Sequence, residues 1–180
     1  MPNLDSIRTN LLRAQSVYLT AADAIPLAHW QTRTSDTSWS ACEVTAHLCQ
    51  VETSIIANSK RILRHEPRYV PFIKRLHFPL FMINYRIRRF RSPLPIDATL
   101  LGEKDAQLGD LRSVRDRTLA FLAETRSRNL TAYCFPHPFL GMFSIYNWLD
   151  LIARHQIRHS KQVHEIVRVL PKRVTPSQIS

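Results

Sequence analysis

Apolar residues recur along the chain at alternating spacings of three and four, the period of an amphipathic helix. The clearest run lies near the N-terminus, where one apolar seam comprises Leu4, Ile7, Leu11, Ala14, Tyr18 and Ala21. A single seam of this kind is typical of a bundle helix, and Pro26 marks its end. Because strand signals are sparse elsewhere, the pattern predicts an all-α protein.

A second helix begins at a recognisable capping sequence. Ser40 and Glu43 form the S-x-x-E of a capping box, and Trp39 with Val44 fits the hydrophobic staple that accompanies it. Its inward face then comprises Val44, His47, Leu48, Val51, Ile55 and Ile62. The prolines at 67 and 71 end this pattern.

The rest of the chain predicts two further helices. Residues 67–104 contain five prolines and read as a long, irregular connection with a short helix near 78–90. A third helix is expected from about Lys104 to Arg126, and a fourth from about Ser144 to Leu170. Together the four helices predict a four-helix bundle in a single domain, residues 1–180, with 171–180 as a flexible tail.

One uncharged stretch, residues 129–149, requires a check for a membrane span. It contains two prolines, Gly141 and two asparagines, which break a helix or place polar groups in lipid. We therefore expect a buried loop that leads into the fourth helix.

Composition excludes several classes of protein. Three glycines leave no room for a G-x-G-x-x-G or Walker-type phosphate loop, and neither motif is present. The three cysteines form no C-x-x-C, so Cys42, Cys49 and Cys134 are expected as reduced thiols, the first two as small buried side chains. The N-terminus does not resemble a signal peptide, and a cytoplasmic location is expected.

The formal net charge of +11 is concentrated in one segment. Residues 60–91 contain ten basic side chains and one acid around the apolar, aromatic stretch 76–85. Three interpretations are open: a basic connector packed on the domain, a surface for an anionic ligand or partner, or a membrane or nucleic-acid surface. No nucleic-acid motif supports the last, so partners of that kind are not expected.

The candidate chemistry lies in the histidines. His155 and His159 are four residues apart on the apolar face of the fourth predicted helix, and His47 lies on the apolar face of the second. Three inward imidazoles from two helices can meet inside a bundle and hold a divalent ion with an open coordination position. Imidazole suits zinc, nickel, copper and iron alike. The alternative is a set of core histidines with ordinary hydrogen-bond partners.

Other polar residues are weaker candidates. The capping box already accounts for Glu43. Glu52 lies about 140° round the helix from His47, so it is not expected to be a ligand. His137 precedes the fourth helix and could line the mouth of a site. The remaining histidines are expected at the surface or in satisfied structural positions: His29, His65, His77 and His164.

Two motifs resemble those of a known family. The W-S-x-x-E-x-x-x-H-L sequence at residues 39–48 resembles an element of the DinB-like metalloprotein superfamily. The second signature of that superfamily is similar to H-P-F-L-G at 137–141, W-L at 148–149 and H-x-x-x-H at 155–159. These motifs cover the second and fourth predicted helices, and the first and third match only in pattern.

The resemblance implies an up-and-down four-helix bundle with a long crossover between the second and third helices, and frequent homodimerisation. It also implies a divalent metal held by His47, His155 and His159, with zinc or nickel expected first and iron, manganese or copper as alternatives. Characterised relatives include transferases and isomerases that use bacillithiol or mycothiol.

We therefore expect a metal-dependent thiol S-transferase or hydrolase that acts on a small substrate, and the basic segment would suit an anionic one. The reacting group would be a metal-bound water or a low-molecular-weight thiol, and no catalytic side chain is identified. The basic segment 60–91 departs from the family pattern and puts the substrates of relatives in doubt. Two alternatives remain: a non-catalytic metal-binding or stress-response bundle, and a basic surface-binding module for anionic partners.

Overall fold

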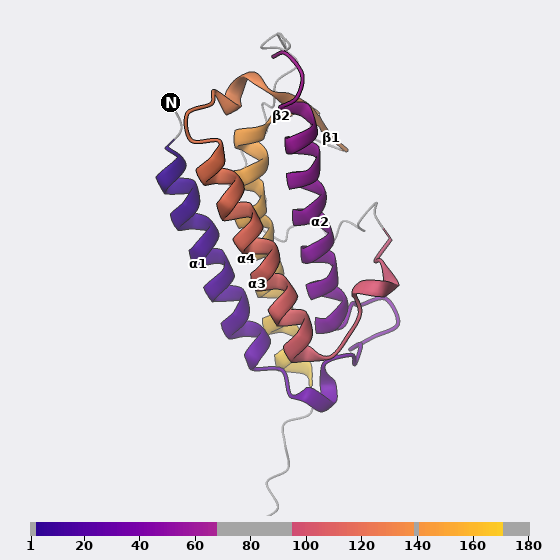
Figure 1. The fold of residues 1–180 in the computed structure, drawn as a ribbon. Helices are drawn as coiled ribbons and strands as arrows, with labels where there is room; N and C mark the ends of the chain where they lie inside the picture. The colour runs from indigo at the N-terminus through magenta and orange to yellow at the C-terminus, as the bar shows by residue number, and fades with distance from the viewer. Residues whose placement is uncertain (1–2, 68–94, 139–140, 171–180) are drawn as a thin grey trace, which may run out of the picture.

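Four long helices form the body of the protein. The computed structural model describes residues 3–67, 95–138 and 141–170. Its helices are α1 (Leu4–Asp23), α2 (Ala41–Ile62), α3 (Lys104–Glu124) and α4 (Ile145–Val169), which lie side by side along one axis (Figure 1). The predicted all-α four-helix bundle is confirmed. The expected short helix near 78–90, most of the basic segment and the C-terminal tail lie outside the described residues.

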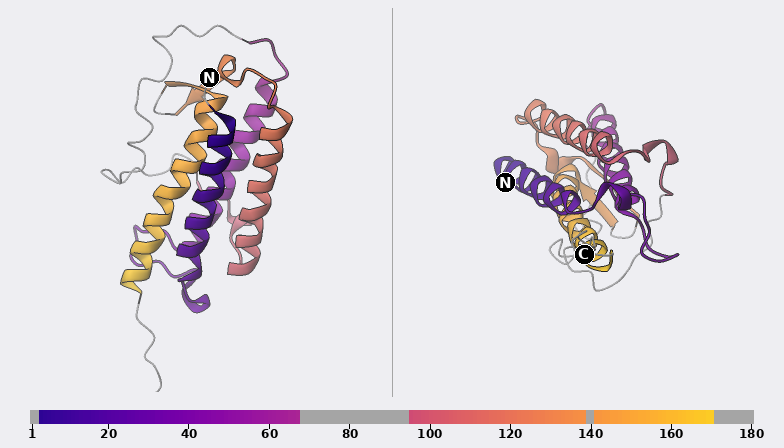
Figure 2. Two further views of the ribbon diagram at one scale, coloured as in Figure 1. Left: turned by 90° about the vertical axis from the view of Figure 1, so that its left-hand side faces the viewer. Right: turned by 90° about the horizontal axis from the view of Figure 1, so that it is seen from below.

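The order of the helices around the bundle differs from their order in the chain. α1 packs chiefly against α4, and α2 against α3, so that α1 and α2 occupy opposite corners (Figure 2). α2 and α3 run in the same direction, since Gln107 in the first turn of α3 donates to the carbonyl of Cys42 in the first turn of α2. The end of α2 and the start of α3 therefore lie at opposite ends of the bundle, as the predicted crossover requires.

Side-chain caps fix the starts of the two helices that carry the candidate histidines. In α2 the amide of Glu43 donates to Ser40 Oγ at 3.2 Å, and the amide of Ser40 donates to Glu43 Oε2 at 2.8 Å. This is the capping box that the sequence predicts. In α4 the amide of Asn147 donates to Ser144 Oγ. Both helices thus begin at defined residues.

The segment between α3 and α4 corrects the expectation of a buried loop. It forms two antiparallel strands, β1 (Cys134–His137) and β2 (Gly141–Ser144), in which Phe135 lies opposite Phe143. Pairing satisfies the backbone of this segment and buries both phenylalanines. Gly141 has a φ of 84°, which favours glycine at the start of β2. None of the described helices is long and apolar enough to span a membrane.

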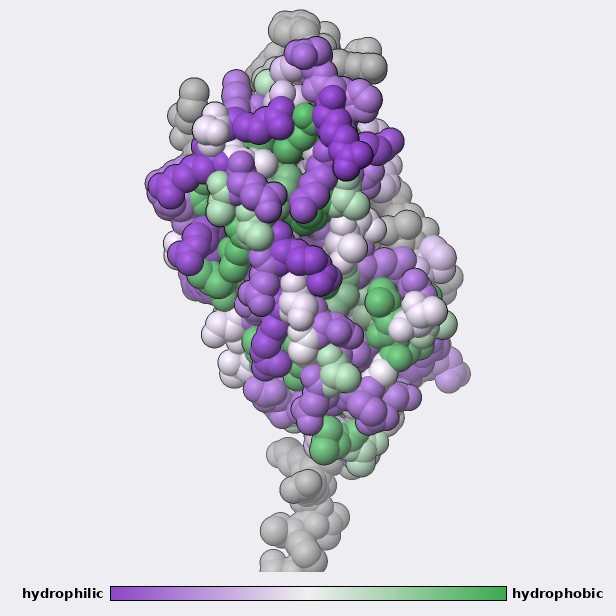
Figure 3. All heavy atoms as spheres, in the orientation of Figure 1, coloured by the Kyte–Doolittle hydropathy of each residue, from purple (hydrophilic) through white to green (hydrophobic). Residues whose placement is uncertain are grey.

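The interior is apolar with a polar centre. Leu11, Tyr18, Phe121 and Leu149 are among the fully buried side chains, and Cys42 and Cys49 are buried as predicted. The face drawn in Figure 3 carries mostly polar side chains, with apolar residues in scattered patches. Several buried polar side chains nevertheless lie among the apolar ones, and they cluster where α2, α3 and α4 approach one another: His47, Glu52, Arg115, Thr118, Gln156 and His159.

Candidate metal centre

The structure brings together the three histidines that the sequence singles out. His47 lies in the second turn of α2, and His155 and His159 lie one turn apart in α4. The Nε2 atom of His155 is 3.3 Å from Nε2 of His47 and 3.0 Å from Nε2 of His159. One ligand atom from each histidine lies within 4.8 Å of the others. We call these three residues the histidine cluster.

These distances fit a shared metal ion. Two imidazole nitrogens at 2.0–2.1 Å from one ion, at angles of about 95–109°, are separated by about 3.0–3.4 Å. The Nε2 separations of His155 from His159 and His47, 3.0 and 3.3 Å, fall in that range. A set of three neutral nitrogen donors suits zinc, nickel, copper or iron better than calcium or magnesium, which prefer oxygen.

The environment keeps two of the imidazoles, those of His47 and His155, neutral, as metal ligation requires. Burial lowers the pKa of His47 to about 4. Desolvation of its ring, followed by electrostatic interactions with His159, His47 and Arg158, holds the pKa of His155 well below the ordinary value. At neutral pH each of these two imidazoles therefore keeps a lone pair available for a metal ion.

Gln162 orients one of the histidines. His159 Nδ1 lies 2.8 Å from Oε1 of Gln162, one turn further along α4. An amide oxygen only accepts, so the proton is on Nδ1 and the lone pair of Nε2 faces the histidine cluster. Such partners of the second ring nitrogen are usual at metal sites. Sequence reasoning missed Gln162, although its spacing of three from His159 was a signal that could have found it.

Trp39 forms a wall beside the histidine cluster. Its ring centroid is 5.0 Å from that of His47 and 6.4 Å from that of His159, whose plane is only 15° from its own. The sequence predicts Trp39 as a staple residue of the α2 start, and the structure adds this contact. Glu43, in contrast, is held by the capping box and by an ion pair with Arg33, in agreement with the structural role expected of it.

Among the described residues, the other histidines are not members of the cluster. His137, on β1, stacks on Phe143 and Trp148 at centroid distances of 4.9 and 5.1 Å. Burial lowers the pKa of His137. His65 and His164 are exposed and His29 is half-buried, whereas His77 lies outside the described residues.

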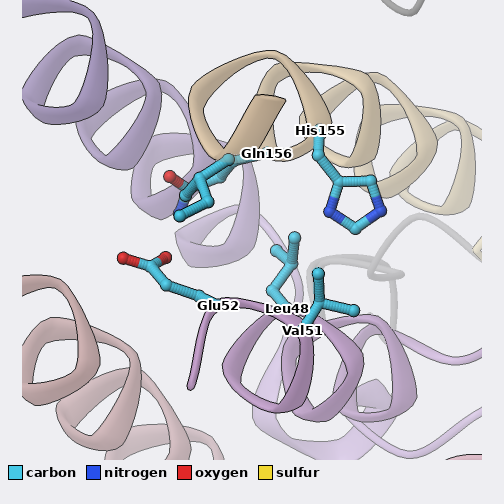
Figure 4. Close-up of a pocket in the computed structure, with 6 residues that line it drawn as sticks. Leu48, Val51, Glu52, His155 and Gln156 are labelled. Atoms are coloured by element: carbon cyan, nitrogen blue, oxygen red, sulfur yellow. The ribbon is translucent and has the colours of Figure 1, made fainter. Parts of the chain in front are cut away.

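Glu52 is not a member of the histidine cluster, as the sequence predicts, but it lies close to it. A small cavity of about 10 Å³ separates Glu52 and Gln156 on one side from His155 on the other (Figure 4). Glu52 forms a buried ion pair with Arg115 at 3.0 Å and accepts from Thr118 at 2.7 Å. The sequence carries no local signal for these contacts, because they join α2 to α3.

Comparison with solved structures identifies proteins of similar fold. YfiT from Bacillus subtilis, described as a probable metal-dependent hydrolase with an unusual four-helix bundle topology, superposes with a TM-score of 0.62 at 18% identity, over 92% of this chain and 86% of YfiT. TT2238, a four-helix bundle protein, gives a TM-score of 0.57 at 20% identity, over 91% of this chain and 99% of its own. These similarities show a shared fold.

Sequence comparison points the same way. The uncharacterised protein YuaE of Bacillus subtilis (strain 168) is 23% identical over 129 residues, which are 71% of this chain and 76% of YuaE. The family model of the DinB superfamily matches residues 10–163, a span that runs from α1 to α4 and contains the whole histidine cluster. The fold, the two motifs and this match lead to one conclusion: the chain belongs to the DinB superfamily.

Proposed function

We propose that this protein is a metal-dependent enzyme, of the hydrolase or thiol S-transferase type, in which His47, His155 and His159 hold one divalent ion. The observation that carries the proposal is the convergence of three imidazoles inside the bundle, with Nε2 separations of 3.0 and 3.3 Å. YfiT, described as a probable metal-dependent hydrolase, adds support for the hydrolase alternative.

The number of donors favours a catalytic over a structural site. Among the described residues, the cluster contains three candidate donors and no fourth histidine, cysteine or acid. Catalytic zinc sites use three protein ligands and keep a position for substrate, whereas structural sites are closed by four. When bound, such an ion acts as a Lewis acid and generates a nucleophile near neutral pH.

The protein's own side chains would prepare the site. Burial keeps His47 neutral, Gln162 holds the His159 ring in one orientation, and the Trp39 ring covers one side of the cluster. We further propose zinc or nickel as the ion, a small substrate, anionic in character, a low-molecular-weight thiol as co-substrate in the transferase alternative, and a homodimer in the cytoplasm.

Elemental analysis of untagged protein tests the proposal. We expect about one zinc, nickel, iron, manganese or copper ion per chain, and its loss in a His155→Ala/His159→Ala variant. His164→Ala is the matched control, because His164 is exposed on the same helix and lies outside the cluster. Equal metal content in the double variant and the wild type would overturn the assignment. With the ion known, ester, amide and thiol-transfer substrates can be screened with loaded protein.

A further inference from the structure

A buried polar network lies next to the histidine cluster, where α2, α3 and α4 meet. Arg115 Nη2 donates to Glu52 Oε2 at 3.0 Å and to Gln156 Oε1 at 2.6 Å. The hydroxyl of Thr118 donates to Glu52 Oε1 at 2.7 Å. The relative exposure of Arg115 and Gln156 is 1%, and that of Glu52 is 3%. The network therefore connects one residue from α2, two from α3 and one from α4 without access to bulk solvent.

This network has more donors than acceptors. In the part of the chain that the structure describes, Gln156 Nε2 and two of the three guanidinium nitrogens of Arg115 are buried without a hydrogen-bond partner. Buried donors in native proteins are nearly always paired with protein or with ordered water. Gln156 lines the small cavity beside the network, so a partner for its amide can be accommodated there.

The cavity has the size and the lining of a water site. Its volume of about 10 Å³ is close to the space that one water molecule occupies. Three of its six lining residues are polar, namely Glu52, His155 and Gln156, and the others are Leu48, Val51 and Ile152. A buried water needs two to four polar partners, a number that this lining supplies.

The imidazole of His155 links the cavity to the histidine cluster. In Figure 4 one of its ring nitrogens lies on the side of Gln156 and Glu52, and the other is turned away from them. Because Nε2 lies 3.0 and 3.3 Å from the Nε2 atoms of His159 and His47, the nitrogen on the cavity side is Nδ1. The Nδ1 atom of His159 lies against Gln162, whereas the Nδ1 atom of His155 faces the cavity.

We propose that one water molecule in this cavity accepts from Nδ1 of His155 and from Nε2 of Gln156 and donates to the carboxylate of Glu52. Glu52 is then a positioning residue, which acts through the water to keep the His155 proton on Nδ1 and the Nε2 lone pair toward the cluster. This inference rests on the proposed function, since orientation of His155 matters most when it holds an ion. A carboxylate that holds the second nitrogen of a ligating histidine is a common arrangement at metal sites.

Two variants test the role of the water from different sides. Glu52→Gln removes the charge of the acceptor, and Val51→Ile fills the cavity with one methylene while leaving the Glu52–Arg115 pair intact. The matched control is Val51→Ala, which enlarges the cavity without blocking it. Glu52→Gln leaves Arg115 beside a neutral group and can fail to fold for that reason. Val51→Ile still tests the proposal in that case.

The readouts are zinc affinity, by competition with a chelator, and the tautomer of His155, by ¹⁵N NMR of metal-free protein. We expect a zinc affinity about 10–100-fold weaker in Glu52→Gln and in Val51→Ile, with the His155 proton no longer confined to Nδ1. Val51→Ala should keep the wild-type tautomer. Wild-type affinity and tautomer in a folded Val51→Ile protein would overturn the inference.

Failure of the proposed function is distinguishable from failure of this inference. Wild-type protein that binds no divalent ion would refute the metal site. In that event the water site is still tested in metal-free protein, by an NMR cross-peak between a long-lived water and the Nδ1 proton of His155. Its presence in the wild type and loss in Val51→Ile supports the inference, and its absence in the wild type overturns it.

Discussion

Replacement of Arg115 by methionine should reveal how strongly the bundle depends on its buried ion pair. The guanidinium is 1% exposed and donates to both Glu52 and Gln156, so the variant leaves a buried carboxylate without its counter-ion. Loss of one partner of a buried pair typically costs about 3–5 kcal/mol. In a protein of 180 residues this corresponds to a decrease in Tm of about 6–20 °C.

The pH dependence of that loss has a defined sign. Burial raises the pKa of Glu52, and Arg115 opposes this shift in the wild type. Without Arg115 the pKa of Glu52 in the folded state rises further above its value in the unfolded chain. The folded variant then binds the extra proton, so its stability relative to wild type is greatest at low pH and decreases as pH rises through the folded pKa.

Urea denaturation of metal-free protein at pH 5 and pH 8 measures both effects. The difference in unfolding free energy between wild type and Arg115→Met should be larger at pH 8. Arg112→Met is the matched control, because Arg112 is exposed on the same helix, and it should change stability by no more than about 0.5 kcal/mol. A cost of Arg115→Met below about 1 kcal/mol, or one that grows at pH 5, would refute the reasoning.

Three further predictions concern the cluster and the hairpin. The pKa of His47, lowered to about 4 by burial, means that stability of metal-free protein should decrease as pH falls from about 6.5 toward 4. The measurement is the urea midpoint across that pH range, which should depend less on pH in His47→Gln than in the wild type. Gln162→Leu should weaken zinc binding about 10-fold by releasing His159, as read by chelator competition, while Gln162→Glu should retain it. Gly141→Ala should lower the unfolding free energy by about 1–2 kcal/mol, because its φ of 84° disfavours a side chain; equal midpoints in urea would contradict this.

The parts of the fold that could be predicted from the sequence are those set by local spacing. The capping box of Ser40 and Glu43 involves residues three apart, and the pair His155 and His159 involves residues four apart on one helix. Periodicity also identifies which faces of α2 and α4 are buried. The histidine cluster could be predicted because the buried faces of both helices carry histidines, and these faces meet inside one bundle.

Other features depend on contacts that no local pattern encodes. The hairpin is short and contains Pro136, so its strands lack the run of alternating residues by which a strand is recognised. Arg115 looks like any charged residue on a helix of mixed polarity, and only its packing between α2 and α4 makes it a partner of Glu52 and Gln156. The order of the helices around the bundle likewise requires the three-dimensional structure.

The position of the cluster has a consequence for the chain as a polymer. His47 and His155 are 108 residues apart in sequence, and they belong to helices that no short loop connects. An ion shared by them closes a loop of more than half the chain, as a reversible cross-link would. Its occupancy would add about 2.7 kcal/mol to the folded state when the free ion is at 100 times its Kd. The melting temperature of this protein would then report the concentration of available metal in its surroundings.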